Sequence, residues 1–278
     1  MASSQGHFAW YELITTDVAA ATTFYTKVMG WGAQDASGPG RPYVLFTAGQ
    51  AVIGGLMGLP EGALAMGGKP YWMGYVGVED VDAAVARIEQ LGGTVHVPPT
   101  DIPNVSRFAV FADPQTATLA LLTSHSPDHA QPADVNAPGR VGWHELFAAD
   151  RDKALVFYGA LFGWQRADGT GETSTYQLFA AGAQTIGGMI TKPPTMPAPF
   201  WLYYFNIDNI EAAAKRVEAG GGRILEGPTE GPAGSWIVQC TDPQGALFAL
   251  EGQRGRRPIG YFERAGSRPD APRRRWSW

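Results

Sequence analysis

Two glutamates at equivalent positions are the side chains of this sequence with the clearest chemical potential. Glu12 and Glu145 each follow a tryptophan by two residues, in the segments AWYELITTDVAAATTFYTKVMGW (9–31) and GWHELFAADRDKALVFYGALFGW (142–164). Both segments begin with an apolar stretch typical of a core strand, where an ionised carboxylate is costly unless it is paired or hydrated. Burial raises the pKa of such a carboxylate, so both glutamates are candidates for ligand recognition or general-base catalysis.

A purely structural role is the alternative for both glutamates. Each carboxylate could form a salt bridge or hydrogen bond with a strand or loop neighbour, for example Arg41 or Arg107. Both copies of the segment keep the glutamate, but a constraint of the fold would have the same result. The sequence therefore leaves the functional and the structural interpretation open.

The adjacent pair His144-Glu145 resembles a metal-binding dipeptide. Successive side chains of a strand point to opposite faces of the sheet, so these two cannot chelate one ion from a regular strand. His144 shares its face with Leu146, and its counterpart in the first segment is Tyr11. We therefore expect His144 to be a hydrogen-bonded packing residue rather than a metal ligand.

These segments are part of a repeat that covers most of the chain. YVLFTAGQAVIGGLM (43–57) matches YQLFAAGAQTIGGMI (176–190) at the same offset of 133 residues, and later stretches match at an offset of 129. The polar, Pro-rich stretch between the copies is typical of a linker. We predict two homologous domains, at residues 6–124 and 139–252. A linker at 125–138 joins them, and a tail follows at 253–278.

Each copy is itself built from two similar segments. Asp17 and Asp80 are predicted helix N-caps, and Gly30 and Gly92 are predicted to end these helices, because Asp accepts orphan backbone N–H bonds and Gly tolerates positive φ. Apolar, aromatic-rich strands are expected on both sides of each helix. In the first copy these strands are 8–15, 43–48, 51–57, 71–78, 94–97, 107–112 and 117–123. The pattern predicts four β-α-β-β-β units.

The composition is that of a packed globular protein. The 278 residues suffice for two ordinary domains, and 45% are hydrophobic against 17% charged. No apolar run is long enough to span a bilayer, and no signal peptide is visible at the N-terminus. The single cysteine, Cys240, has no partner for an internal disulfide, which suits a reducing compartment. We expect a soluble, cytoplasmic protein.

Charge is distributed unevenly along the chain. Residues 252–278 carry eight arginines against Glu263 and Asp270, a net charge of +6. Because the whole chain has a net charge of −5, the rest of it carries −11. Such an acidic body is unsuited to binding a phosphate backbone, and we expect no nucleic-acid partner. The tail could contact an acidic partner, but we favour arginines that are solvated or paired with the protein's own acidic surface.

The order of these motifs resembles the vicinal oxygen chelate superfamily. The resemblance rests on the TTD cap, the FYxxxxGW helix end, the GVEDVDAAVARIEQLGG helix and the closing DPQ strand, and it covers residues 6–251. The superfamily includes glyoxalase I, bleomycin-resistance proteins and extradiol dioxygenases. The resemblance implies an α+β fold of two tandem glyoxalase-like domains, with four βαβββ units whose curved mixed sheets enclose a cleft. In the enzymes this cleft holds a divalent metal.

The metal positions implied by the resemblance carry no suitable donors. Divalent ions need His, Asp, Glu or Cys side chains. The equivalent positions here are Trp10, Gly54, Met73, Ala120, Trp143, Gly187, Leu202 and Ala249. A shift of two residues along a strand would keep the face and leave Glu12, Glu145 and Glu251 as substitutes. We expect no cofactor, and a divalent metal only if its ligands are displaced in this way.

The predicted cleft is mostly aromatic, with a few polar groups, as a pocket for a planar or apolar small molecule requires. The residues expected to line it are Trp10, Glu12, Met73, Tyr75, Trp143, Glu145, Leu202, Tyr204 and Asn206.

The sequence leads to two hypotheses of function. The first is a binding protein like the bleomycin-resistance branch, without the metal site of the family. The alternative is a lyase, isomerase or dioxygenase that uses displaced ligands or an organic cofactor. We expect a small-molecule ligand and no membrane partner, and either a homodimer or a monomer whose two copies pair to build the cleft.

Overall fold

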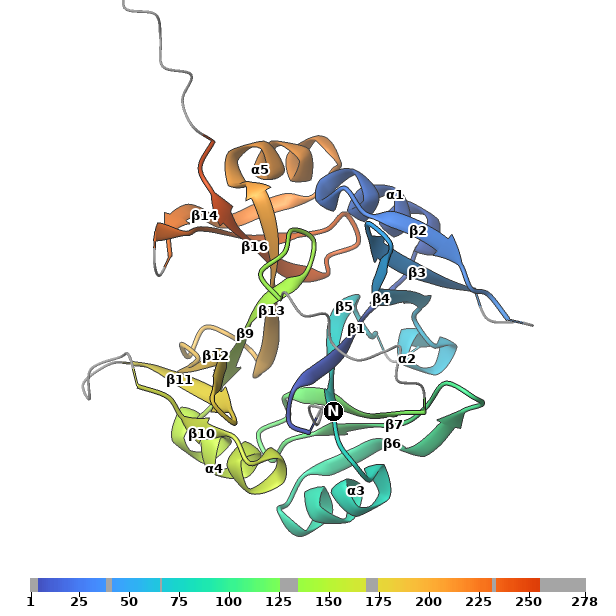
Figure 1. The fold of residues 1–278 in the computed structure, drawn as a ribbon, viewed down its shortest axis with the longest axis vertical. Helices are drawn as coiled ribbons and strands as arrows, with labels where there is room; N and C mark the ends of the chain where they lie inside the picture. Colours follow the sequence, from blue (N-terminus) through green and yellow to red (C-terminus); the bar gives the residue numbers. More distant parts are fainter. Residues whose placement is uncertain are drawn as a thin grey trace, which may run out of the picture.

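The chain folds into two units of the same architecture, one from each sequence copy (Figure 1). The computed structural model describes residues 5–38, 42–65, 67–125, 135–168, 175–231 and 234–255. The elements of the first copy are β1 (Phe8–Thr15), α1 (Val18–Met29), β2 (Gly32–Asp35), β3 (Tyr43–Ala48), β4 (Ala51–Gly58), α2 (Glu61–Ala65), β5 (Tyr71–Gly77), α3 (Val81–Gln90), β6 (Thr94–Ile102), β7 (Ser106–Ala112) and β8 (Thr118–Ser124). Those of the second copy are β9 (Val141–Ala148), α4 (Arg151–Phe162), β10 (Gln165–Arg166), β11 (Tyr176–Ala181), β12 (Gln184–Thr191), β13 (Phe200–Asn209), α5 (Ile210–Ala219), β14 (Arg223–Glu230), β15 (Trp236–Thr241) and β16 (Leu247–Gln253).

Each copy forms one eight-stranded mixed sheet. The first has the strand order β2-β3-β4-β1-β5-β8-β7-β6, and the second repeats it as β10-β11-β12-β9-β13-β16-β15-β14. The central pair β1 and β5 is antiparallel, whereas β1 with β4 and β5 with β8 are parallel. The predicted fold class, two tandem α+β domains of βαβββ units, is confirmed.

The helix ends lie where the caps predicted them. The side chain of Asp17 accepts a hydrogen bond from the backbone N–H of Ala20 at 2.9 Å, and α1 is followed by Gly30 at φ 74°. Asp80 caps α3 in the same way. The short elements β2, β10 and α2 were not predicted, and β6 extends beyond the expected 94–97 to Ile102. Residues 126–134 of the predicted linker and 256–278 of the tail lie outside the described part of the chain.

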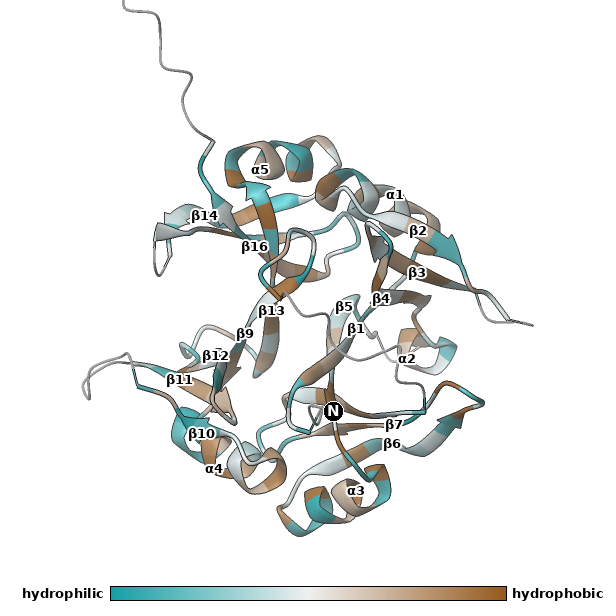
Figure 2. Ribbon diagram, in the orientation of Figure 1, coloured by the Kyte–Doolittle hydropathy of each residue, from teal (hydrophilic) through white to brown (hydrophobic). Residues whose placement is uncertain are grey.

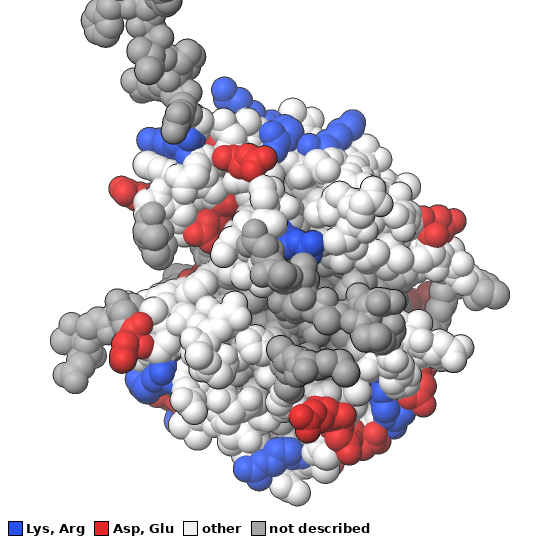
Figure 3. All heavy atoms as spheres, in the orientation of Figure 1, with Lys and Arg blue, Asp and Glu red and all other residues white. Residues whose placement is uncertain are grey.

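The two copies pack through the helix-bearing sides of their sheets. α1 lies beside α5 and α3 beside α4, so each contact joins helices of different copies (Figure 1). One hydrophobic core runs through both copies, with Phe8, Tyr25 and Phe205 among its buried members. Strands near the middle of the molecule carry many apolar residues in Figure 2, and most of the charged side chains on the face drawn in Figure 3 lie toward its edge.

Two equivalent hydrogen bonds connect the copies across this interface. Tyr25 donates to Asp242 at 3.2 Å, and the equivalent Tyr158 donates to Asp113 at 3.0 Å. The two copies pack on each other within one chain, although the strands of each sheet come from one copy alone. That this pairing builds the cleft stays a prediction. Whether the chain is a monomer or a homodimer stays a prediction. Within the described residues, no helix has the length and apolar character of a membrane span.

Candidate functional site

Glu12 lies on the side of its sheet that faces away from the helices. Leu13, its neighbour on β1, points to the shared core, and the alternation of the strand directs Glu12 the opposite way. The Glu12 side chain is nevertheless buried. Its Oε1 accepts a hydrogen bond from the Tyr43 hydroxyl at 2.7 Å, and its Oε2 accepts one from the Tyr75 hydroxyl, also at 2.7 Å. Tyrosines, rather than arginines, hold this carboxylate.

Glu145 has the same surroundings in the second copy. Its Oε2 accepts a hydrogen bond from the Tyr204 hydroxyl at 2.5 Å, and Tyr176 forms a further hydrogen bond to the carboxylate. The indole Nε1 of Trp143 donates to the Tyr176 hydroxyl at 2.9 Å. The repeat therefore reproduces a carboxylate held between two tyrosines.

Burial shifts the acidity of both carboxylates. It raises the pKa of Glu12 and of Glu145, because a desolvated carboxylate favours its neutral form, and the hydrogen bonds from tyrosines oppose this shift. Burial and the neighbouring Glu145 raise the pKa of Tyr204 far above its ordinary value, so the phenol stays a hydrogen-bond donor. Each glutamate can accept a proton from a ligand more readily than an exposed one could.

The surface around each glutamate forms what we call a glutamate face. The first glutamate face consists of Trp10, Glu12, Ile14, Tyr43, Met57, Leu59, Met73, Tyr75, Val97, Phe108, Val110, Ala120 and Leu122. The second glutamate face consists of Trp143, Glu145, Phe147, Tyr176, Phe200, Leu202, Tyr204, Glu226, Ile237, Gln239, Leu247, Ala249 and Glu251. On the second face the rings of Phe147 and Phe200 stack in parallel, with their centroids 4.8 Å apart.

Most of the residues predicted to line the cleft lie on these faces. Trp10, Met73 and Tyr75 surround Glu12, and Trp143, Leu202 and Tyr204 surround Glu145.

Asn206, a predicted cleft residue, pairs in register with Glu251 of β16, and it also contacts the segment before β9. Its amide Nδ2 donates to the carbonyl oxygen of Val135 at 2.8 Å, and its own backbone bonds both Gly139 and Arg140. Asn206 thus binds residues of the segment 135–140, which leads into β9 of the second copy.

The two glycines of the predicted metal positions face away from the glutamate faces, whereas the next glycine of each strand faces toward them. A Cβ built on Gly54 or Gly187 would meet the backbone of the first strand of its copy, whereas one built on Gly55 would lie 2.0 Å from the Tyr43 hydroxyl. Gly188 has the same relation to Tyr176. Gly55 and Gly188 therefore belong to the glutamate faces, and their missing side chains leave the space that the tyrosines fill.

Tyr43 and Tyr176 were missed by the sequence reasoning. Both begin the strand that precedes the IGG motif, at the repeat offset of 133 residues. The signal was the coincidence of a repeated tyrosine with repeated glycines on the next strand.

The residues of the glutamate faces do not fit a divalent metal of the family type. Among the described residues, no three His, Cys, Asp or Glu side chains come together as a set that could hold an ion. Both oxygens of Glu12 already accept hydrogen bonds from tyrosines. If the metal positions are shifted by two residues along the strands, the possible ligands are Glu12, Glu145 and Glu251, and none of these is a histidine.

His144 lies on the opposite side of its sheet and joins the two copies. Its Nε2 is 2.6 Å from the Tyr11 hydroxyl, and its Nδ1 is 2.6 Å from the carbonyl oxygen of Ile186. Its ring stacks on Phe8, with centroids 3.8 Å apart. Burial lowers the pKa of His144 to about 4, so the imidazole is neutral near pH 7. The expectation of a hydrogen-bonded packing residue is confirmed.

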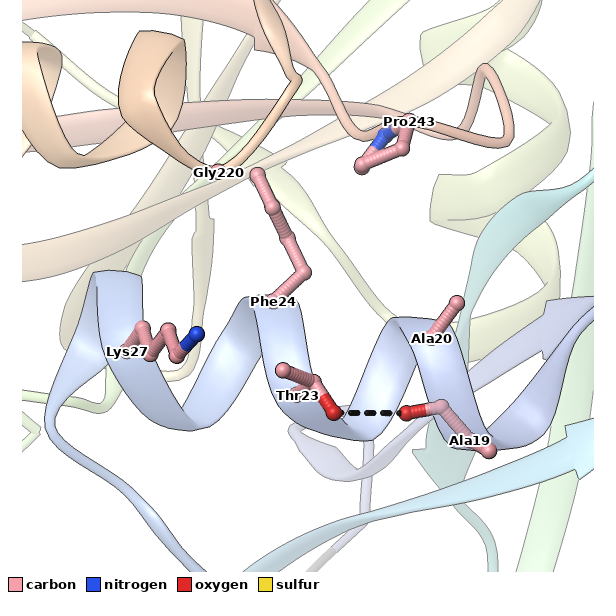
Figure 4. Close-up of a pocket in the computed structure, with 7 residues that line it drawn as sticks. All are labelled: Ala19, Ala20, Thr23, Phe24, Lys27, Gly220 and Pro243. Carbon is pink, nitrogen blue, oxygen red and sulfur yellow. Dashed lines mark hydrogen bonds between the residues drawn. The ribbon is translucent and has the colours of Figure 1, made fainter.

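Two pockets lie at the boundary between the copies. One, of about 420 Å³, opens between α1 and α5, where Phe24 extends toward Gly220 (Figure 4). Its other lining residues are small or apolar except Thr23 and Lys27, so it offers little chemistry. The second, of about 240 Å³, borders His144 and Trp143.

The suggested arginine partners of the glutamates have other contacts. Arg107 pairs with Asp82 at 2.7 Å and with Asp101 at 2.9 Å, away from Glu12. Arg41 lies outside the described residues.

Comparison with known proteins places this geometry in context. The family model for the glyoxalase/bleomycin resistance protein/dioxygenase superfamily matches residues 5–121 and 140–250. CFP32 of Mycobacterium tuberculosis, whose name assigns it provisionally to the glyoxylases, is 32% identical over 249 residues, 88% of this chain and 94% of that protein. The anthracycline biosynthesis protein DnrV of Streptomyces peucetius is 30% identical over 254 residues, 87% and 91% of the two chains.

Two solved structures share the fold at 15% sequence identity. The Mn(II)-bound glyoxalase from Novosphingobium aromaticivorans superposes with a TM-score of 0.62, covering 90% of this chain and 83% of that one. Homoprotocatechuate 2,3-dioxygenase from Brevibacterium fuscum, in complex with 3,4-dihydroxyphenylacetate, gives a TM-score of 0.61 over 89% and 80% of the two chains.

Proposed function

Because the chain belongs to the glyoxalase/bleomycin resistance protein/dioxygenase superfamily, we propose that it binds a small, planar aromatic or apolar organic molecule on its glutamate faces, without the metal centre of the family. The observation that carries this proposal is a buried carboxylate held by tyrosines within an aromatic surface, present in both copies. Aromatic walls favour a flat ligand, and one acceptor among them orients its polar groups.

The second glutamate face is the better candidate for ligand binding. Trp143, Phe147 and Phe200 are each only partly buried, so their rings are accessible to a flat ligand. Glu145 can accept a hydrogen bond from a hydroxyl or amine of that ligand. The amide of Gln239, whose Nε2 is 3.4 Å from the Tyr204 hydroxyl, adds a second polar group.

The names of the relatives agree with an aromatic ligand. DnrV and its counterpart DauV from Streptomyces sp. are named for anthracycline biosynthesis, and anthracyclines are planar polycyclic aromatic compounds. We extend only the chemical class, a fused aromatic ring system with hydroxyl groups, to this chain.

Proton transfer by Glu145 is a second candidate function. The raised pKa of this buried carboxylate suits a general base, and a ligand with an acidic C–H beside a carbonyl could lose a proton to it. Incorporation of deuterium from heavy water into a bound ligand would distinguish such a lyase or isomerase from a binding protein.

Titration with quinizarin, a dihydroxyanthraquinone, tests the proposal. We expect saturable quenching of tryptophan fluorescence, with an affinity that falls about tenfold in Glu145→Gln and is unchanged in Glu89→Gln, an exposed residue of α3. Elemental analysis of protein purified without chelator should give far less than one divalent ion per chain. Absence of saturable binding would contradict the ligand class, and a stoichiometric metal that survives dialysis would contradict the metal-free site.

A further inference from the structure

The second glutamate face carries negative charge that the first lacks. Glu226 pairs in register with Gln239, and Glu251 pairs with Ile237, so both carboxylates border the residues of this face. At the equivalent positions the first copy has the apolar residues Val97 and Leu122. The added acids are thus a property of the second face alone, and the fold does not require them.

The chain leaves the second copy along the strand that forms part of this face. β16 carries Glu251 on the second glutamate face and ends at Gln253. The guanidinium carbon of Arg254 lies 3.5 Å from the centroid of the Trp236 ring, and its Nε is 3.2 Å from Glu211 of α5. Both partners lie on the helix-bearing side of the sheet, so residues 256–278 begin there, at the end of β16, and must pass around the end of the sheet to reach the glutamate face.

The sequence that follows complements the face in charge and in chemical type. Residues 256–278, RRPIGYFERAGSRPDAPRRRWSW, hold seven arginines against two acidic residues, and four aromatic residues. At roughly 3.3 Å per extended residue, even half of this segment can cross a sheet whose strands lie about 4.8 Å apart. Guanidinium groups bind carboxylates through paired hydrogen bonds and stack on aromatic rings.

We propose that residues 256–278 bind to the second glutamate face of their own chain. Arginine side chains pair with Glu226 and Glu251, and aromatic residues of the segment pack beside Trp143 and Phe200. The segment then competes with a ligand for this face, whereas the first glutamate face stays open. The docking itself does not depend on the ligand of the proposed function.

The pocket between α1 and α5 is a weaker docking site for this segment. It is lined by small or apolar residues and by Lys27, which would repel an arginine-rich chain. The site of docking is therefore decided by the carboxylates, and the salt dependence of docking should reflect them.

Photo-crosslinking in the full-length chain tests the proposal without any ligand. We would replace Trp276 by p-benzoylphenylalanine, irradiate dilute protein and map the cross-links by mass spectrometry. We expect cross-links within one chain to peptides of β9, β13 and β15, with a yield that falls at least fivefold at high salt. The double variant Glu226→Gln/Glu251→Gln should lose as much, and its circular dichroism reports whether the fold persists.

The matched control is Glu61→Gln/Glu89→Gln, which removes the same charge from exposed positions of the first copy. It should leave the yield unchanged. Cross-links to α1 or α5, cross-links only between chains, or equal yields in the two double variants would overturn the proposal. None of these outcomes bears on quinizarin binding, so the docking and the proposed function can fail separately.

Discussion

Glu12 of the first copy lies among apolar residues such as Leu122, whereas in the second copy Glu226 lies near Glu145 and Glu251 lies near its partner Tyr176. The tyrosines that hold the two carboxylates are the same in both copies, but the positions around them have diverged. What the copies share is therefore compatible with a requirement of the fold. The residues that differ between the two faces must therefore determine which ligand each face prefers.

The largest expected effect concerns a position where the copies differ outright, Tyr11 against His144. In the folded chain, burial lowers the pKa of His144 from its ordinary value of 6.5 to about 4. The unfolded chain therefore takes up this proton first, so stability present above pH 6.5 is lost as the pH falls toward 4, by roughly 3 kcal/mol. Urea unfolding at pH 7 and pH 4.5 should show this loss in the native protein and a much smaller one in His144→Gln, in which only His7, whose pKa burial also lowers, contributes in this way.

The matched control for that experiment is His125→Gln, which removes a histidine near the end of the first copy. It tests whether the loss of any histidine has the same effect as the loss of His144. A native slope that persists in His144→Gln would show that another group is responsible.

An intermediate effect is expected at the shared carboxylates. Glu12→Gln and Glu145→Gln should each lower the free energy of unfolding by about 1–3 kcal/mol, because the glutamine NH₂ cannot accept one of the two tyrosine hydroxyls. Similar losses in both variants, measured by thermal melts, would support a common structural core. Quinizarin affinity should fall only in Glu145→Gln, and unchanged affinity in both variants would end the ligand role of these groups.

The same variants have a pH signature opposite to that of His144. Burial raises the folded pKa of Glu12 and Glu145, so the folded chain keeps these protons after the unfolded chain has lost them. Their contribution is present below the ordinary value of 4.5 and is lost as the pH rises through the folded pKa. The Gln variants should therefore show a smaller decrease of stability with rising pH.

The smallest effect is expected at another unequal pair, Arg107 against Trp236. Arg107 bridges Asp82 and Asp101, but both aspartate side chains are 60% exposed. Arg107→Gln should lower the free energy of unfolding only slightly at low salt and not at all at high salt. A salt-independent loss as large as that of the buried glutamates would contradict this comparison.

The fold could be predicted because its signals are local and occur twice. Helix caps such as Asp17 and Asp80 depend on residues three positions away, and the repeat fixed the number of units. The hydrogen bond of Tyr43 to Glu12 joins strands that are distant in the sequence, and no local rule predicts it. The space that Gly55 leaves for the Tyr43 hydroxyl likewise depends on the pairing of β3 with β4.

The hydrogen bond between Tyr25 and Asp242 has a consequence for how the protein is made. Its partners are 217 residues apart in the sequence, whereas those of the equivalent bond, Tyr158 and Asp113, are 45 residues apart. During synthesis, the helix-bearing side of the first copy is covered only by its own helices until the second copy leaves the ribosome. The nascent chain thus passes through a stage with exposed aromatic groups, and the delay favours association with chaperones at that stage.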